Sequence, residues 1–283
     1  MYQLIADSGS TKTDWAIINN KNEEIKRIKT IGFNPYFQDS NYIYSVLSEA
    51  FSNITIDFKD VTEIHYYGAG CSTQENKEVV KIALAKLFSN STIKVHHDLI
   101  AAARATLGKK KGIACILGTG SNSCVWENEK EVQNIESHGY IFGDEGSGSH
   151  LGIRLIQLYL SGNLDEKIKN QFDKEFNISK KEILHRTYRD KNPNVFLASF
   201  AKFYQQFVDE PILRSIILNE FEEFFQKRII PYHNYQNYQV GFIGSISFFY
   251  QDLLLEVANK YSITVSKITR CPIDELIIYH SVN

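Results

Sequence analysis

The sequence lacks three features that would place it in a familiar class: paired cysteines, a long apolar run and a strong excess of one charge. The four cysteines show no CxxC spacing, so neither a zinc site nor a disulfide framework is expected; they are Cys71, Cys115, Cys124 and Cys271. No apolar run approaches the length of a membrane span. Because the net charge is only −2 and the basic residues are scattered, we expect neither a nucleic-acid partner nor a membrane partner.

The remaining composition is that of a soluble globular protein. Of the 283 residues, 43% are hydrophobic and 23% are charged, and the length allows two domains of ordinary size. Met1 leads directly into a predicted strand, so we expect no signal peptide and a cytoplasmic location. The Phe- and Tyr-rich segment 196–230 is either core or the surface of a homodimer.

The first informative stretch is Asp7–Trp15, read Asp-Ser-Gly-Ser-Thr-Lys-Thr-Asp-Trp, between two apolar runs. Two short strands joined by small residues predict a hairpin in which Gly9 takes a positive φ and lets the backbone approach a ligand. Hydroxyls, turn amides and one lysine suit a polyphosphate; the candidate phosphate-binding residues are Asp7, Ser8, Gly9, Ser10, Thr11, Lys12 and Thr13. Asp7 also suits Mg²⁺ held through water. A plain polar hairpin is the alternative.

The same pattern returns 111 residues later, where Gly120 aligns with Gly9 and Trp126 aligns with Trp15. The candidate phosphate-binding residues of this second turn are Gly118, Thr119, Gly120 and Ser121. A repeated strand–turn–strand unit predicts two similar domains that hold one nucleotide between them.

The predicted elements repeat as βββαβαβα, with an N-terminal domain over 1–109 and a C-terminal domain over 110–283. In the second half, a strand is predicted over 132–137 and the first helix over 145–161. A purely helical insertion at about 165–230 follows that helix, and a further helix is predicted over 246–260. The last helix, 272–280, is a candidate to pack back on the first domain. Duplicated α/β halves with two phosphate turns point to the actin-like ATPase (ribonuclease H-like) fold.

Four motifs resemble the BadF/BadG/BcrA/BcrD ATPase family, and within it the N-acetylglucosamine kinases. They are Asp7-Ser-Gly-Ser-Thr-Lys-Thr-Asp14, His97-Asp98-Leu99, Leu117-Gly-Thr-Gly-Ser121 and Gly143-Asp-Glu-Gly-Ser-Gly148. The resemblance covers essentially the whole chain and implies ATP, Mg²⁺ and a sugar substrate. It makes Asp98 the general base that accepts the proton of the attacking hydroxyl. The residues alone allow an N-cap carboxylate at Asp98 equally well.

The resemblance also implies the sugar-binding residues, which are Asn34, Asp98, Thr119, Tyr140, Asp144 and Glu145, and an adenosine-binding turn at Gly244 and Ser245. From the residues alone, Asn34 before a proline favours a turn, and Asp144 and Glu145 suit a helix start. Four glycines around these two carboxylates exceed what a helix start needs, which predicts close packing against a ligand or another backbone segment.

The resulting hypothesis is an ATP-dependent kinase that phosphorylates N-acetylglucosamine, with the 6-hydroxyl as the expected acceptor. N-acetylmuramic acid and glucosamine are alternative substrates. A different class, the ATP-driven activators of 2-hydroxyacyl-CoA dehydratases, would need cysteines for an iron–sulfur cluster, and no ligand pair is evident. A non-catalytic sugar sensor is a third reading, which the presence of Asp98 disfavours.

Overall fold

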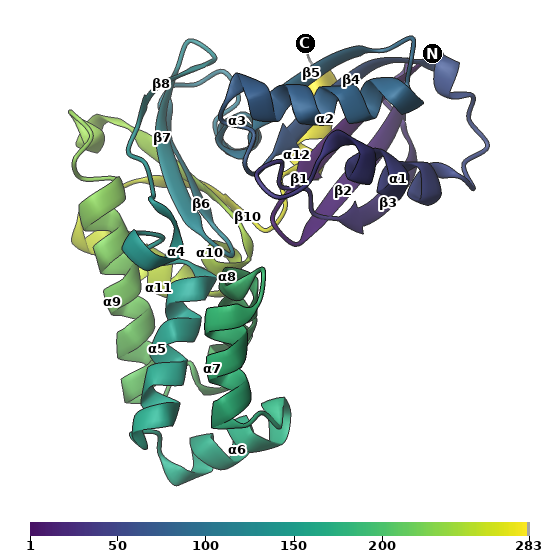
Figure 1. The fold of residues 1–283 in the computed structure, drawn as a ribbon. Coiled ribbons are helices and arrows are strands. Elements are labelled where there is room, and N and C mark those ends of the chain that lie inside the picture. Colours follow the sequence, from purple (N-terminus) through teal and green to yellow (C-terminus); the bar gives the residue numbers. More distant parts are fainter. Residues whose placement is uncertain (282–283) are drawn as a thin grey trace. The chain divides into compact units, whose positions relative to one another are not determined.

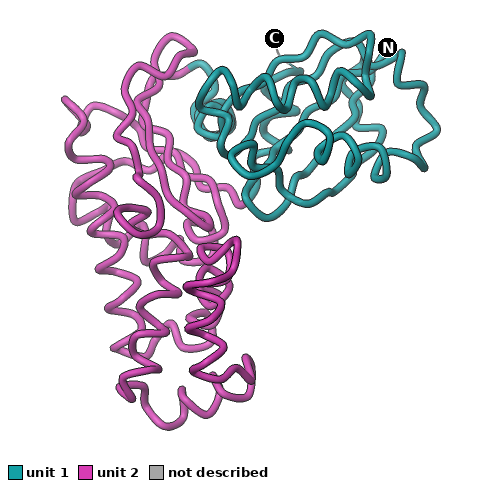
Figure 2. The backbone as a smooth tube through the Cα atoms, viewed as in Figure 1, with its two compact units in different colours: residues 1–109, 271–283 teal, residues 110–270 magenta. Residues whose placement is uncertain are grey.

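The computed structural model describes residues 1–281, which form two compact units (Figure 2). Unit 1 comprises residues 1–109 and the chain from Cys271 on, and unit 2 comprises residues 110–270. The last helix of the predicted second domain, 110–283, therefore belongs to unit 1. The reason is apolar packing, because Ile273 and Leu276 of that helix are buried against Ile5 and Ala101 of unit 1.

Unit 1 is a five-stranded sheet with helices on both faces (Figure 1). The strand order is β3-β2-β1-β4-β5; β1, β2 and β3 are antiparallel neighbours, whereas β4 and β5 run parallel to β1. The elements are β1 (Tyr2–Ser8), β2 (Lys12–Asn19), β3 (Glu24–Ile31), α1 (Ser40–Phe51), η1 (Phe58–Asp60), β4 (Val61–Gly68), α2 (Gln74–Leu87), β5 (Thr92–His97), α3 (Asp98–Thr106) and α12 (Ile273–Ser281).

Side-chain alternation along β1 decides which helices cover each face of this sheet. Leu4 and Ala6 join the core beneath α1 and α2, whereas Ile5 joins the core beneath α3 and α12. Asp7 follows Ile5 on the second face, so the strand delivers its carboxylate to the side on which the chain enters α12.

Unit 2 repeats the topology of unit 1 around a second sheet, whose order is β10-β9-β6-β7-β8. Read from β8, this is the same succession of two antiparallel and two parallel pairs. The predicted duplication is therefore confirmed. The elements are β6 (Gly112–Leu117), β7 (Ser121–Glu127), β8 (Lys130–Asn134), α4 (Gly139–Phe142), α5 (Gly148–Ser161), α6 (Glu166–Phe176), α7 (Lys180–Arg189), α8 (Pro193–Ser199), η2 (Phe200–Phe207), α9 (Pro211–Arg228), η3 (Tyr235–Asn237), β9 (Gln239–Ile243), α10 (Ser245–Phe249), α11 (Gln251–Lys260) and β10 (Val265–Thr269).

Three predicted boundaries in unit 2 were wrong. The helix expected over 145–161 begins only at Gly148, because Ser147 is its N-cap and accepts a hydrogen bond from the amide of His150. The strand expected over 132–137 ends at Asn134. The helix expected over 246–260 is two helices, since Tyr250 leaves helical geometry with φ −115° and ψ 29°.

The helical insertion spans α6 to α9 and packs on α5, with which it shares one continuous apolar core (Figure 1). Phe200, Phe203 and Phe221 lie fully or almost fully buried there, so much of the aromatic content of 196–230 is core. Among the described residues, no helix is long and apolar enough to cross a membrane.

Candidate functional site

The first predicted phosphate turn is a tight hairpin between β1 and β2. The amide of Gly9 donates to the carbonyl of Lys12 over 2.9 Å. The hydroxyls of Ser8 and Thr13 lie 2.7 Å apart, both fully buried, and Thr13 also donates to the carbonyl of Ile31. These two hydroxyls therefore stabilise the hairpin, and Ser10 and Thr11, which are exposed, are the hydroxyls open to a ligand.

Packing within the described part of the protein does not require glycine at position 9 or at position 118. The expectation that Gly9 takes a positive φ was wrong, and a Cβ there would meet only the carbonyl of Lys12, at 3.8 Å. A Cβ at Gly118 would meet nothing within 4 Å. By contrast, a Cβ at Gly32 would lie 2.1 Å from the carbonyl oxygen of Gly9. The space beside Gly9 and Gly118 is open, as a ligand that approaches the backbone requires.

A pair of carboxylates lies at the base of the first turn. Asp7 and Asp14 are directly opposite each other on β1 and β2, which places like charges side by side. Lys12 binds Asp14 over 2.5 Å, and the thiol of Cys271 lies 3.4 Å from Asp14 and 3.7 Å from Asp7. Burial, followed by repulsion from Asp14 and from Asp98, raises the pKa of Asp7 to about 7.

This pair suits a divalent cation. The ligand atoms of Asp7, Asp14 and Cys271 lie within 4.8 Å of one another. Mg²⁺ takes carboxylate oxygens and retains several waters, whereas the sulfur of Cys271 suits softer metals. The carboxylates of Asp7 and Asp14 therefore fit Mg²⁺, and a cation there would relieve the repulsion that raises the pKa of Asp7. Asp14 and Cys271 were missing from the predicted set.

Asp98 is the first residue of α3, and His97 is the N-cap of that helix without a side-chain capping bond. The N-cap reading of Asp98 is thus not what the structure shows. Because β5 runs parallel to β4 and β1, Asp98 follows the same edge of the sheet on which β1 delivers Asp7. The Asp98 side chain is 33% exposed, and its charge contributes to the raised pKa of Asp7.

Asn34 belongs to a turn, as its position before Pro35 predicts. Its side-chain oxygen accepts from the amide of Tyr36, and its carbonyl accepts from the amides of Phe37 and Gln38. A Cβ at Gly70, which has φ +76°, would lie 2.5 Å from that side-chain oxygen. The turn therefore fixes the orientation of the Asn34 amide in unit 1.

The second phosphate turn, Gly118–Ser121, is enclosed by glycines of two other segments. The amide of Gly148, at the start of α5, donates to the carbonyl of Gly118 over 2.8 Å. Gly244, which follows β9 and precedes α10, has φ +117°, and a Cβ there would lie 2.2 Å from the carbonyl oxygen of Leu117. Gly244 and Ser245, the predicted adenosine turn, therefore lie directly beside the second phosphate turn.

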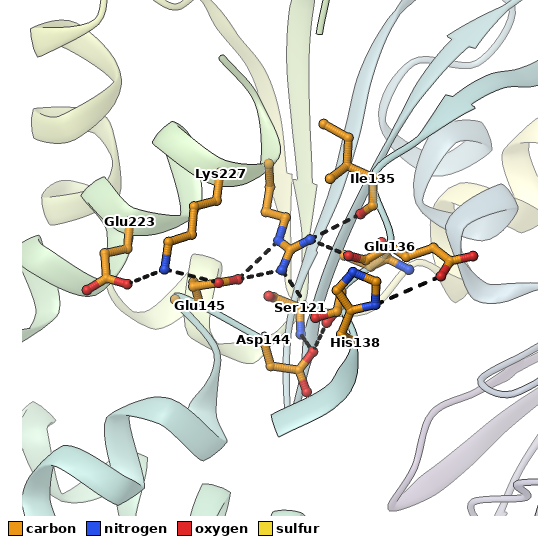
Figure 3. Close-up of polar contacts among 12 residues, drawn as sticks. Ser121, Ile135, Glu136, His138, Asp144, Glu145, Glu223 and Lys227 are labelled. Carbon is orange, nitrogen blue, oxygen red and sulfur yellow. Dashed lines mark hydrogen bonds and ion pairs between the residues drawn. The ribbon is translucent and has the colours of Figure 1, made fainter. Parts of the chain in front are cut away.

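Asp144 points at this second turn (Figure 3). Its carboxylate accepts from the amide of Ser121 over 3.1 Å and from the hydroxyl of Ser137, and it packs against Gly120. Burial raises the pKa of Asp144 above its usual value, against the two hydrogen bonds, which lower it. Its φ of +61° is a left-handed conformation that a non-glycine residue adopts only where its surroundings enforce it.

Glu145, the neighbour of Asp144, faces away from it and is bound to α9 (Figure 3). Arg228 donates to one of its oxygens over 2.8 Å and 3.0 Å, and Lys227 lies 3.3 Å from the other. Both Glu145 and Arg228 are almost fully buried. The surrounding glycines have packing reasons, as predicted: a Cβ at Gly143 would lie 1.4 Å from the carbonyl oxygen of Ser137, and one at Gly152 would lie 1.8 Å from that of Leu197.

The remaining predicted sugar residues lie on the same part of unit 2. Thr119 lies within the second turn, and Tyr140 lies on the short helix α4, where it packs partly against the core. Unit 1 thus brings together Asp7, Lys12 and Asp98, and unit 2 brings together the second turn, Asp144 and Gly244. Arg228 and Ser137 were missed by the sequence reasoning, because their partners lie 83 and 7 residues away along the chain and no short motif marks them.

Comparison with known proteins gives one family match. The sequence profile of the BadF/BadG/BcrA/BcrD ATPase family matches residues 6–208. A Porphyromonas gingivalis protein, whose crystal structure is described as that of a candidate N-acetylglucosamine kinase, is 37% identical, with 99% of both chains covered and a TM-score of 0.94.

Two further likenesses are more limited. An N-acetylmuramic acid/N-acetylglucosamine kinase of Clostridium acetobutylicum is 28% identical over 51% of this chain, and the match covers only 42% of that relative. A ROK family glucokinase from Streptomyces griseus, solved with glucose and AMPPNP, shares the fold alone: it is 11% identical, covers 100% of this chain and 99% of its own, and has a TM-score of 0.58. The actin-like ATPase fold predicted from the repeat is thereby confirmed.

Proposed function

Since the chain belongs to the BadF/BadG/BcrA/BcrD ATPase family, we propose that it is an ATP-dependent kinase that phosphorylates the 6-hydroxyl of N-acetylglucosamine. The observation that carries the proposal is the likeness to the Porphyromonas gingivalis candidate kinase, which extends along nearly the whole of both chains. The open space at Gly9 and Gly118 supports nucleotide binding independently.

In this proposal Asp98 is the general base. Its carboxylate accepts the proton of the sugar hydroxyl while the hydroxyl oxygen bonds to the γ-phosphorus and the bond from that phosphorus to ADP breaks. The position of Asp98 at the first residue of α3 leaves its side chain partly exposed, as contact with a substrate requires.

The two turns hold the phosphates. The exposed Ser10 and Thr11 serve the first turn, and Thr119 serves the second, where the open space beside Gly118 lets a phosphate approach the backbone. Asp7 and Asp14 would hold Mg²⁺ through water, and Mg²⁺ supplies charge neutralisation of the phosphates. Gly244 and Ser245 are assigned to the adenosine.

Asn34 and Asp144 are assigned to sugar hydroxyls, and Tyr140 to an apolar face of the sugar. Asp144 carries more weight than Glu145 in this assignment. Glu145 is already occupied by Arg228 and Lys227, and we assign it to the support of the site and not to the substrate itself.

N-acetylmuramic acid and glucosamine remain the alternative acceptors within this class. The dehydratase-activator reading is disfavoured by the cysteines themselves. Cys71, Cys115 and Cys124 are buried inside their units, and Cys271 lies against two carboxylates. None of the four presents an exposed thiolate to a second copy of the chain, which a shared cluster needs.

The test is sugar-dependent release of ADP from Mg-ATP across N-acetylglucosamine, N-acetylmuramic acid, glucosamine, N-acetylmannosamine and glucose. We expect the largest kcat/KM with N-acetylglucosamine and a product phosphorylated on the oxygen of carbon 6 by NMR. A larger kcat/KM with another sugar would replace the substrate, and no response to any sugar would overturn the kinase assignment.

A further inference from the structure

We propose that α9, the last helix of the insertion, is a positioning element for the sugar site, and that Arg228 is its principal positioning residue. The inference rests on the proposed function, because it takes Asp144 to be a sugar ligand. It assigns a role to the insertion, which the repeat of the fold does not require, and to a residue that no motif marks.

Arg228 binds two chain segments at once. Its Nε and Nη2 donate to Glu145 over 3.0 Å and 2.8 Å. The same guanidinium donates to the carbonyl of Glu136 and, over 3.1 Å, to the carbonyl of Ser137. One buried side chain thus ties the segment after β8 to the segment before α5, and these two segments bracket α4.

Ser137 transmits this restraint to Asp144. Its carbonyl is held by Arg228, and its hydroxyl donates to the Asp144 carboxylate. Ser137 also packs against Gly143 so closely that no side chain fits there. The left-handed φ of Asp144 therefore persists between two segments that Arg228 keeps together.

A second anchor on α9 holds the other side of the same loop. Glu220 lies two helical turns before Arg228 and therefore on the same face of the helix. Its carboxylate accepts from the amide of Gly146 over 3.3 Å and binds His150 and Arg154, at 3.1 Å and 2.8 Å. Phe224, between the two anchors, packs against Gly146. The loop 144–147 thus lies along one face of α9.

Stability alone is a poor reason for this arrangement. A buried ion pair gains little net free energy over apolar residues of similar volume, because the desolvation of both charges offsets their attraction. A planar guanidinium with five donors can hold a carboxylate and two carbonyls at fixed angles, which neither an apolar residue nor a lysine can do. The arrangement is suited to fixing geometry.

The experiment uses two variants: the single variant Arg228→Lys, and a double variant that carries both Arg228→Met and Glu145→Gln. The lysine keeps the charge without the fork, and the double variant removes both charges so that neither is left unpaired. The matched controls lie on the same helix: Arg214→Met removes an arginine that binds Glu256 of α11, and Leu213→Ala removes buried apolar volume. Sugar and ATP kinetics are measured for each, with hydrogen exchange of residues 135–147.

In both Arg228→Lys and the double variant, we expect kcat/KM for the sugar to fall about 10- to 100-fold, through a higher KM or a lower kcat. Losses of this size are typical when a residue that orients a ligand-binding side chain is removed. The KM for ATP should change less than about threefold, and exchange in 135–147 should rise without sugar. Leu213→Ala should lower Tm without these changes. Sugar kinetics equal to those of Leu213→Ala at matched Tm would overturn the inference.

The failure of the proposed function has a different signature. The wild type could phosphorylate no sugar while exchange in 135–147 still rose only in the Arg228 variants. The restraint that Arg228 places on this loop would then be supported, and its assignment to a sugar site would be wrong. If the wild type were active and exchange in 135–147 did not change in the Arg228 variants, the proposal that Arg228 restrains this loop would be wrong.

Discussion

Replacement of Gly118 by alanine tests whether glycine is required there for ligand binding or for the stability of the protein. A Cβ at this position meets nothing within 4 Å, and the backbone there is outside the left-handed region that favours glycine. Alanine should therefore be accommodated without strain in the protein itself. The added methyl would occupy the space that we assign to a phosphate.

The expected magnitudes have opposite signs for stability and activity. Gly→Ala at a compatible position stabilises by about 0.4–1 kcal/mol, because the unfolded chain loses conformational freedom. A methyl group that displaces the phosphate by about 1 Å costs about 100-fold in kcat/KM for ATP, which is about 2.7 kcal/mol of transition-state stabilisation.

The assay is ADP release at varied ATP with saturating sugar, together with thermal unfolding in the absence of nucleotide. Gly152→Ala is the control, because its Cβ would lie 1.8 Å from the carbonyl oxygen of Leu197 and should lower Tm. An ATP kcat/KM within about threefold of wild type for Gly118→Ala, with Tm unchanged or raised, would refute the assignment of this turn to the phosphates.

Three further predictions concern unit 1. Gly32→Ala should lower both Tm and ATP kcat/KM, because its Cβ would overlap the carbonyl of Gly9 and push the first turn aside; wild-type values for both would contradict this. Asp14→Asn should raise the Mg²⁺ concentration for half-maximal activity about 10-fold, measured by Mg²⁺ titration at fixed ATP, and an unchanged titration would remove Asp14 from the cation site. Burial lowers the pKa values of His65, His96 and His280 to about 4, 3 and 2, so between about pH 6.5 and these values the unfolded chain binds protons that the folded chain does not. The free energy of unfolding should therefore be highest above about pH 6.5 and fall as the pH drops, by up to about 2 kcal/mol per histidine at pH 5. Urea unfolding that gives equal free energies at pH 7 and pH 5 would contradict this prediction.

The sequence predicts the fold well because the repeat is local and periodic. Each copy is a strand, a glycine turn and a second strand within one short segment, Tyr2–Asn19 and Gly112–Glu127, and the two sheets share one order of strands. The boundary errors have local causes that periodicity does not detect. The Ser147 cap delays α5, and Tyr250 interrupts what reads as one helix.

The site is predictable where a motif carries it and not where the tertiary fold assembles it. Asp7 lies in the motif of the first turn and Asp144 in a glycine-rich motif, so the sequence predicts both. Asp14 could be predicted only from the register of the hairpin. A turn that pairs Ser8 with Thr13 also pairs Asp7 with Asp14, but the motif alone does not show this pairing. Arg228 reaches Glu145 across 83 residues, and nothing in its local sequence distinguishes it from the adjacent Lys227.

The most direct measurement of the central claim compares kcat for N-acetylglucosamine between wild type and Asp98→Asn, with sugar and ATP affinities measured by calorimetry. The account predicts that kcat falls about 10²- to 10⁴-fold, as for loss of a general base, while both affinities change little. A variant that retains wild-type kcat would contradict the assignment of Asp98 as the base.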